Sequence, residues 1–85
     1  MRKIVLTKHA LEDLIFWSKN DAKSIRKIFD LISDAQRNPF EGIGKPEALK
    51  FNLAGCWSRR IDDMNRLVYQ VTEDEIKIIS CRYHY

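Results

Sequence analysis

The chain opens with a short strand-like run followed by apolar positions at helical spacing. Residues 3–6 suit a brief opening strand, and Thr7 after them is a residue type that caps helix N-termini. A first helix is predicted beyond Thr7, because apolar side chains recur three and four positions apart. These side chains are Leu11, Leu14, Ile15 and Trp17.

A second helix has the clearest periodicity in the chain. Asn20 or Asp21 ends the first helix and caps the second, and Asn38-Pro39 stops the second. Between these limits, apolar residues follow the i, i+3, i+4, i+7 pattern and charged residues fill the opposite face. The apolar stripe consists of Ala22, Ile25, Ile28, Phe29, Ile32 and Ala35. Two amphipathic helices joined by so short a turn predict a helical hairpin packed on a flat partner.

The second half of the chain has β-structure patterns after a long loop. Residues 37–55 hold all three glycines and both prolines, which predicts a loop with one short ordered piece at 48–53. Strand-like runs then follow at 56–61, 66–72 and 76–85, and two short polar turns join them. Turns this short favour an antiparallel meander. We therefore expect a single α+β domain, residues 1–85, with both N-terminal helices on one face of the sheet.

Alternation along these strands predicts one cationic sheet face. The polar set is Ser58, Arg60, Arg66, Gln70, Ser80, Arg82 and His84. The apolar set is Trp57, Ile61, Leu67, Tyr69, Val71, Ile79, Cys81, Tyr83 and Tyr85. The exceptions are Val68, Ile76 and Ile78, which fall with the polar set, and Arg59, which falls with the apolar one.

Composition narrows the class of protein. A hydrophobic content of 45% in 85 residues supports one compact core, and the net charge of +3 permits a polyanionic partner without requiring one. The N-terminus lacks the pattern of a signal peptide, and no apolar stretch approaches the roughly 20 residues of a membrane helix. Cys56 and Cys81 lack metal-ligand spacing and are expected to be reduced thiols. We expect a cytoplasmic protein with no membrane contact.

Arginines within strands and a histidine near the end of the last one suit cleavage of a phosphodiester. Metal-free RNA cleavage needs a base for the 2′-hydroxyl proton, an acid for the departing 5′-oxygen and a cation for the charge on phosphorus. Glu47 is the candidate base, His84 the candidate acid, and Arg66 with Arg60 the candidate phosphate clamp. Lys45 and Lys50 flank Glu47 and would favour its ionised form. The remaining strand arginines, Arg59 and Arg82, are further candidates for phosphate contact.

Taken singly, each of these residues has a plain structural explanation. A loop glutamate is usually a solvated charge, arginines on a sheet face often only keep it soluble, and a histidine near a terminus is more often incidental than catalytic. Tyr83 and Tyr85 suit stacking on nucleobases, but packing under the helices explains at least one of them as well. Trp57 and Tyr69 are expected in the core, and His9 on the surface of the first helix.

The order of short sequence blocks is far more specific than any one residue. The blocks are Asn38-Pro39-Phe40-Glu41-Gly42, Gly44-Lys45-Pro46-Glu47, Asn52-Leu53, Gly55, Trp57-Ser58-Arg59-Arg60-Ile61, Arg66-Leu67-Val68-Tyr69 and Cys81-Arg82-Tyr83-His84-Tyr85. In this order they resemble the YoeB/Txe toxins of the RelE-like superfamily of bacterial toxin–antitoxin systems. The resemblance covers essentially the whole chain.

This resemblance implies a ribosome-dependent endoribonuclease that cuts mRNA in the decoding site, inhibits translation and is neutralised by a cognate antitoxin. It also implies a microbial-RNase-like sheet, a possible homodimer, and transesterification without metal or cofactor that leaves a 2′,3′-cyclic phosphate. By matching motifs, Glu47 is the general base, Arg66 stabilises the transition state and His84 is the general acid. Tyr85 orients or stacks on the substrate, and phosphate is bound by Arg60 and Lys50.

Some features leave the prediction open. Cys56 stands where the family often has an aromatic residue, Ala48 where a second proline is common, and Asn65 where a histidine often precedes Arg66. Asn65 leaves any substrate contact from its turn undecided. One alternative is an RNA- or ribosome-binding inhibitor without chemistry, which needs the arginines but not the base–acid pair. A weaker alternative is a protein-interaction module.

Overall fold

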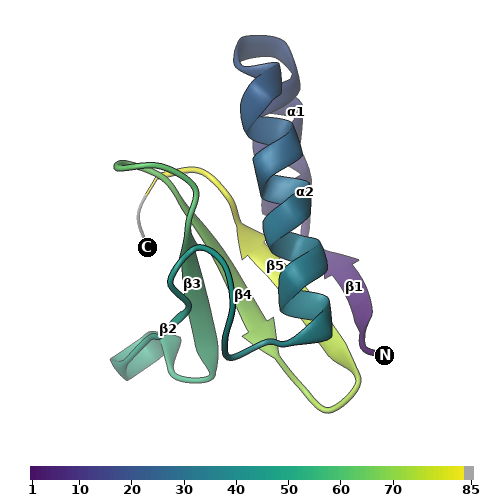
Figure 1. Cartoon of the computed structure of the whole chain (residues 1–85), viewed down its shortest axis with the longest axis vertical. Helices are drawn as coiled ribbons and strands as arrows, with labels where there is room; N and C mark the ends of the chain where they lie inside the picture. The colour runs from purple at the N-terminus through teal and green to yellow at the C-terminus, as the bar shows by residue number, and fades with distance from the viewer. Residues whose placement is uncertain (84–85) are drawn as a thin grey trace.

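The computed structural model describes residues 1–83, and in them two helices and five strands follow the order β1–α1–α2–β2–β3–β4–β5 (Figure 1). The helices are α1 (Lys8–Asn20) and α2 (Ala22–Arg37). The strands are β1 (Lys3–Leu6), β2 (Glu47–Ala48), β3 (Cys56–Arg60), β4 (Arg66–Val71) and β5 (Glu75–Ser80). A turn of 3-10 helix, η1 (Phe51–Leu53), lies between β2 and β3.

The strands form one sheet in the order β1-β5-β4-β3-β2. The predicted meander of β3, β4 and β5 is confirmed, and β2 adds an antiparallel edge to β3. At the other edge, β1 pairs parallel with β5, and the helical hairpin supplies part of the long crossover that a parallel pair needs. Both helices cover the same face of the sheet (Figure 1). The predicted α+β fold is therefore confirmed.

Both helices begin and end where local sequence chemistry places them. Thr7 Oγ1 accepts a hydrogen bond from Ala10 N at 3.1 Å and donates one to the Ile78 carbonyl at 2.9 Å, which ties the start of α1 to β5. Asp21 separates the helices and occupies the N-cap position of α2, where its carboxylate accepts from the Ser24 hydroxyl.

No helix within residues 1–83 combines the length and apolarity that a membrane span requires.

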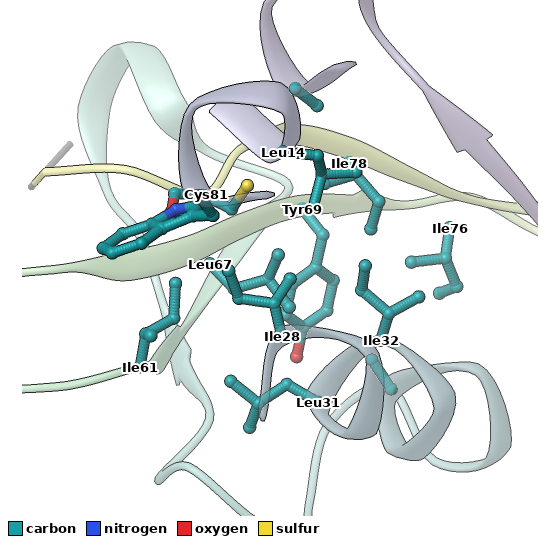
Figure 2. Packing of buried hydrophobic residues seen from close by; sticks show 13 residues of the cluster. Leu14, Ile28, Leu31, Ile32, Ile61, Leu67, Tyr69, Ile76, Ile78 and Cys81 are labelled. Carbon is teal, nitrogen blue, oxygen red and sulfur yellow. The ribbon is translucent and has the colours of Figure 1, made fainter. Parts of the chain in front are cut away.

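The main core lies between the two helices and the sheet. Tyr69 of β4 is fully buried at its centre, among Ile28 and Leu31 of α2 and Ile78 of β5 (Figure 2). Burying a side chain of this size stabilises the fold by roughly 2 kcal/mol. The core therefore fixes α2 against the middle of the sheet.

A β-bulge changes which side chains of β5 face this core. Tyr69 pairs with Ile78, but Val68 pairs with Ser80, so Ile79 is an additional residue in the ladder. Ile78 consequently faces the helices, while Ile79 packs on the opposite face against a second cluster of buried residues, Leu49, Cys56 and Val68.

The predicted sides of Ile76, Ile78 and Ile79 are wrong for this reason. Ile76 and Ile78 lie in the main core, and Ile79 lies on the outer face. An extra residue gives the positions before it and after it opposite parity, so Ile76 and Ile78 share a face with Cys81, and alternation alone does not reveal where the extra residue falls.

The last strand is also shorter than the predicted run of residues 76–85. β5 ends at Ser80, because side chains of α1 occupy the backbone groups of Cys81. Cys81 N donates to Asp13 Oδ2 at 3.0 Å, and the Cys81 carbonyl accepts from Trp17 Nε1 at 2.8 Å. A backbone bonded to helix side chains in this way has no group left for the sheet ladder.

Candidate RNA-binding face and active site

Four polar side chains share the sheet face that points away from the helices. Glu47 of β2 pairs with Ser58 of β3, and Arg60 of β3 pairs with Arg66 of β4. Cross-strand partners lie on the same face, as do residues two apart on one strand. Two strand spacings and two residues of rise separate Glu47 from Arg66, about 12 Å between Cα atoms. Both side chains are long enough to approach one group placed between them.

Arg60 and Arg66 face each other directly across β3 and β4. Like charges opposite each other destabilise a sheet. Arg60 Nη2 lies 3.5 Å from Asp63 Oδ1, a solvent-exposed pair of small energetic value. Arg66 Nη1 instead donates to the backbone carbonyls of Asp62 and Asn65, at 2.6 and 3.0 Å. A bound anion would relieve the repulsion between the two guanidinium groups.

Asp62 shapes the turn that places Arg66 at the start of β4. Its carboxylate accepts hydrogen bonds from Met64 N at 2.8 Å and Asn65 N at 2.7 Å, and from the Asn65 side-chain amide. Partial burial acts to raise the pKa of Asp62, but these hydrogen bonds and the charge of Arg66 outweigh it, and the pKa is lowered overall. The ionised carboxylate thus organises the turn.

The loop before β2 carries Lys45 and leads directly into Glu47, the first residue of β2. The Gly44 carbonyl accepts from Arg60 N at 2.7 Å, which joins the loop to β3. Gly44 has a φ of +80°, and a Cβ there would lie 2.7 Å from Leu31 Cδ2, so only glycine fits. Lys45 and Lys50 are both exposed on either side of Glu47, as the sequence order predicts.

Arg59 does not lie on the outer face, and its predicted contact with phosphate is corrected here. Its side chain is fully buried beneath the loop of residues 38–43. The guanidinium donates all five of its N–H groups inside the protein: to the Tyr69 hydroxyl, to Asp34 Oδ2 and to the carbonyls of Asn38, Glu41 and Ile43. Arg59 therefore holds the loop that leads to Glu47. Its position in the apolar set of the alternation agrees with this burial on the helix side of the sheet.

Arg82 likewise lies apart from the Arg60–Arg66 pair. Its Cζ atom sits 3.5 Å from the centre of the Phe16 ring on α1 and 4.4 Å from that of Tyr83. Its Nη2 donates to the Tyr83 hydroxyl at 2.6 Å. The guanidinium thus lies over two aromatic rings, one of them on α1, and not on the open cationic face where alternation had placed it. Its contact with phosphate stays a prediction.

The candidate acid His84 and the substrate-orienting Tyr85 lie outside the described residues. Tyr83 immediately precedes them, and its carbonyl accepts a hydrogen bond from Arg66 N at 3.0 Å. The chain therefore approaches position 84 from beside Arg66.

Phe51 is an exposed aromatic side chain that sequence reasoning missed. It follows Lys50, is 91% exposed and has a φ of +59°. Residues 47–53 line a hollow of about 350 Å³ beside it. The available signal was that Phe51 belongs to neither helical stripe and to none of the strand-like runs.

The cysteines offer no nucleophile to this face. Cys56 and Cys81 are free and buried, and burial raises the pKa of both thiols, that of Cys81 to about 12. Within residues 1–83, no three His, Cys, Asp or Glu side chains gather as a metal site requires.

Known proteins resemble this chain over nearly all of its length. The model of the YoeB-like toxin of bacterial type II toxin–antitoxin systems matches residues 6–85. Toxin YoeB of Escherichia coli K12 is 49% identical over 83 residues, which cover 98% of this chain and 99% of the relative. Toxin RelK of Mycobacterium tuberculosis is 51% identical over the full length of both chains.

Solved structures show the same fold. A YoeB/ParE toxin from Agrobacterium tumefaciens superimposes with a TM-score of 0.94 at 47% identity, covering 98% of this chain and 99% of that one. The YoeB dimer from Staphylococcus aureus matches with a TM-score of 0.90 at 48% identity, covering 99% and 98%. YafQ from E. coli shares the fold alone, with a TM-score of 0.77 at 15% identity.

The two-helix, five-stranded architecture is thus that of the RelE-like toxins. Within that class, this chain belongs to the YoeB-like toxin family of bacterial type II toxin–antitoxin systems. The resemblance to YoeB/Txe toxins predicted from the sequence blocks is confirmed.

Proposed function

We propose that this toxin is a ribosome-dependent endoribonuclease that cuts mRNA in the ribosomal A site and so inhibits translation. The observation that carries the proposal is the Arg60–Arg66 pair, two directly opposed guanidinium groups on the sheet face that also holds Glu47. Guanidinium groups bind phosphate oxygens bidentately, and a phosphate between them would offset their repulsion. The same face therefore supplies a phosphate site and a carboxylate near it.

In the proposed reaction, Glu47 removes the proton from the 2′-hydroxyl, and that oxygen attacks the adjacent phosphorus. Arg66, aided by Arg60, stabilises the extra negative charge on the phosphorane. The bond from phosphorus to the 5′-oxygen breaks, and His84 donates a proton to the departing oxygen. The products are a 2′,3′-cyclic phosphate and a free 5′-hydroxyl. All of the proton transfers use side chains, so the scheme needs no metal or cofactor.

The flanking residues supply contacts with single-stranded RNA in this proposal. Lys45 and Lys50 bind backbone phosphates on either side of Glu47, and Tyr85 orients the substrate. The exposed ring of Phe51 stacks on a nucleobase in the adjacent hollow. Combining cations with exposed aromatics is the usual way to bind a strand whose bases are unpaired.

Partners follow from the small size of this surface. With a net charge of +3, the protein offers few phosphate contacts of its own, so the ribosome supplies most of the substrate positioning, in the cytoplasm. Relatives from S. aureus were solved as a YoeB–YefM complex and as a YoeB dimer. We propose an antitoxin of that kind, and self-association, for this chain as well.

The test is to add purified toxin to translating ribosomes and map the mRNA ends. Wild type should cut within the A-site codon, and Glu47→Gln and His84→Ala should each reduce the cleavage rate by about a hundredfold or more. Glu73→Gln is the matched control, because Glu73 is an exposed glutamate in the turn between β4 and β5. Its cleavage rate should equal that of wild type.

Two results would contradict the proposal. Cleavage at wild-type rates by both Glu47→Gln and His84→Ala would remove the acid–base mechanism. Translation arrest without any cut, lost only when Arg60 and Arg66 are replaced together, would show a non-catalytic RNA- or ribosome-binding inhibitor instead.

A further inference from the structure

The segment after β5 is held by hydrogen bonds along its length, although it belongs to no helix or strand. The N–H and carbonyl of Cys81 bond to Asp13 and Trp17 of α1. The N–H of Tyr83 bonds to Asn65 in the turn between β3 and β4, and its carbonyl bonds to Arg66 at the start of β4. Chain ends are normally the least ordered part of a domain unless something ties them down. Here both the N–H and the carbonyl of Tyr83, the residue before His84, are hydrogen-bonded.

Asn65 makes the contact nearest to that position. Its Oδ1 accepts the N–H of Tyr83 at 2.6 Å, and the next residue, Arg66, donates its N–H to the Tyr83 carbonyl at 3.0 Å. Tyr83 has a φ of +64°, a left-handed conformation that a tyrosine adopts only when its surroundings enforce it. The pair of hydrogen bonds from residues 65 and 66 supplies that enforcement.

Asn65 is itself held in one orientation. Its side-chain Nδ2 donates to both carboxylate oxygens of Asp62, at 3.0 and 3.1 Å. This contact leaves Oδ1 as the free end of the amide, pointed at Tyr83 N. The order of contacts is therefore Asp62 to Asn65 to the backbone of Tyr83.

A stack of side chains braces the segment from the other side. The Arg82 guanidinium lies over the rings of both Phe16 and Tyr83. A hollow of about 320 Å³ beside this stack separates α1 from Met64 and Asn65. Without the hydrogen bond from Asn65, the backbone at Tyr83 has open space into which it can move.

We propose that Asn65 is a positioning residue, whose amide oxygen sets the backbone at Tyr83 and so supports the proton transfer assigned to the next residue, His84. This inference rests on the proposed function, in which His84 is the acid. Asn65 touches neither substrate nor reacting atoms; it acts through Tyr83. It also gives a role to the residue that stands where YoeB/Txe toxins often have histidine.

The test compares three variants of the full-length toxin. Asn65→Ala removes the contact, and Asp63→Asn is the control in the same turn, since the Asp63 side chain is fully exposed. The double variant D62N/N65D exchanges the two side chains. The new carboxylate at position 65 accepts from Tyr83 N, and the new amide at position 62 donates to that carboxylate. Measurements are single-turnover cleavage on ribosomes, its dependence on ribosome concentration, and amide hydrogen exchange at Tyr83 in the toxin alone.

For Asn65→Ala we expect Tyr83 to exchange about tenfold faster, the equivalent of one lost hydrogen bond. The cleavage rate at saturation should fall by about a hundredfold, because a small misplacement of a catalytic group has that effect. The ribosome concentration that gives half the maximal rate should change by less than about threefold, because binding is not affected. D62N/N65D should recover most of the rate, and Asp63→Asn should match wild type throughout.

The outcomes separate this inference from the proposed function. If Asn65→Ala cuts at the wild-type rate while His84→Ala does not cut, the positioning role is wrong and the endoribonuclease proposal stands. If Tyr83 exchanges at its wild-type rate in Asn65→Ala, the positioning role is wrong as well. If His84→Ala cuts normally, the proposed mechanism fails, whatever the exchange at Tyr83 shows. Should Asn65→Ala fail to fold, a D62N/N65D variant that folds but cuts a hundredfold more slowly than wild type would overturn the inference.

Discussion

Arg59 Nη1 donates to Asp34 Oδ2 at 2.6 Å, and this ion pair joins β3 to α2 beneath the loop that leads to Glu47. The Arg59 side chain is fully buried and that of Asp34 is 19% exposed. A buried guanidinium is tolerated only because every N–H group has a partner. The main effect of the pair is therefore structural: it lets Arg59 stay buried and hold the loop of residues 38–43 in place.

Arg59→Leu should destabilise the protein by about 3–5 kcal/mol, the usual cost of breaking a buried pair by removing one partner. In this variant Asp34 loses its buried Arg59 donor, and the Tyr69 hydroxyl and three backbone carbonyls lose theirs as well. Arg59→Lys should recover little of the loss, since an ammonium group cannot serve five acceptors. Urea unfolding at pH 7 measures the effect, with the exposed Arg60→Leu as control. A loss for Arg59→Leu no larger than that of the control would contradict the structural role.

Stability should fall in acid through Asp34 and Asp62. The hydrogen bond from Arg59, which outweighs the opposing effect of burial, lowers the pKa of Asp34 from 3.8, and hydrogen bonds in its turn lower that of Asp62. A lowered folded-state pKa gives stability that is complete above the unfolded value of 3.8 and is lost as pH falls through the folded value. Unfolding midpoints measured from pH 6 down to about 2 should drop steeply below pH 4. Asp34→Asn should start lower at neutral pH and show a shallower acid slope; an unchanged slope would refute the assignment.

Removing one arginine from the Arg60–Arg66 pair should relieve a repulsion. Arg60→Gln is expected to be as stable as wild type or up to about 1 kcal/mol more stable at low ionic strength, and the gain should vanish in high salt. Added inorganic phosphate should raise the melting temperature of wild type more than that of Arg60→Gln. A melting temperature of wild type that does not respond to phosphate would count against an anion site on this face.

Phe51 should contribute to RNA binding and not to the fold. Phe51→Gly removes a ring that is 91% exposed and relieves a positive φ, so stability should stay the same or rise by about 1 kcal/mol. Affinity for single-stranded RNA should weaken by about 1–3 kcal/mol, the value of one stacked base. Phe29→Ala is the control, since Phe29 is an exposed phenylalanine on α2. Equal RNA affinity in both variants would exclude the stacking role.

Much of the fold could be predicted because its signals are local. Thr7, the apolar stripe of α2 and the polar turn at 62–65 each act on neighbouring residues, and the observed elements begin and end close to the predicted positions. Arg60 and Arg66 were also placed correctly on one face, since strand alternation decides the side on which a residue lies. Glu47 was predicted only as a loop residue, and its pairing with Ser58 in β2 is visible only in the structure.

The errors arose where distant parts of the chain decide the outcome. The bulge at Ile79 reversed the sides of Ile76, Ile78 and Ile79, and α1 ended β5 by bonding the backbone of Cys81. Asn65 appeared in the sequence only as a departure from a family pattern. Its contact with Tyr83 joins residues 18 positions apart, which no periodicity encodes.

The sequence by itself determined the element order, the cationic strands and the family, because each depends on residue types at short spacing. The tertiary structure alone decided which arginines are available. Arg59 is enclosed because Asp34, Tyr69 and three loop carbonyls converge on it, whereas Arg82 is half-buried and lies over the Phe16 ring of α1. Arg60 and Arg66 lie opposite each other on the face away from the helices, where Arg60 pairs with the exposed Asp63 and Arg66 donates to two carbonyls of its own turn. The position of an arginine side chain depends on the acceptors around it, and tertiary packing decides where those acceptors lie.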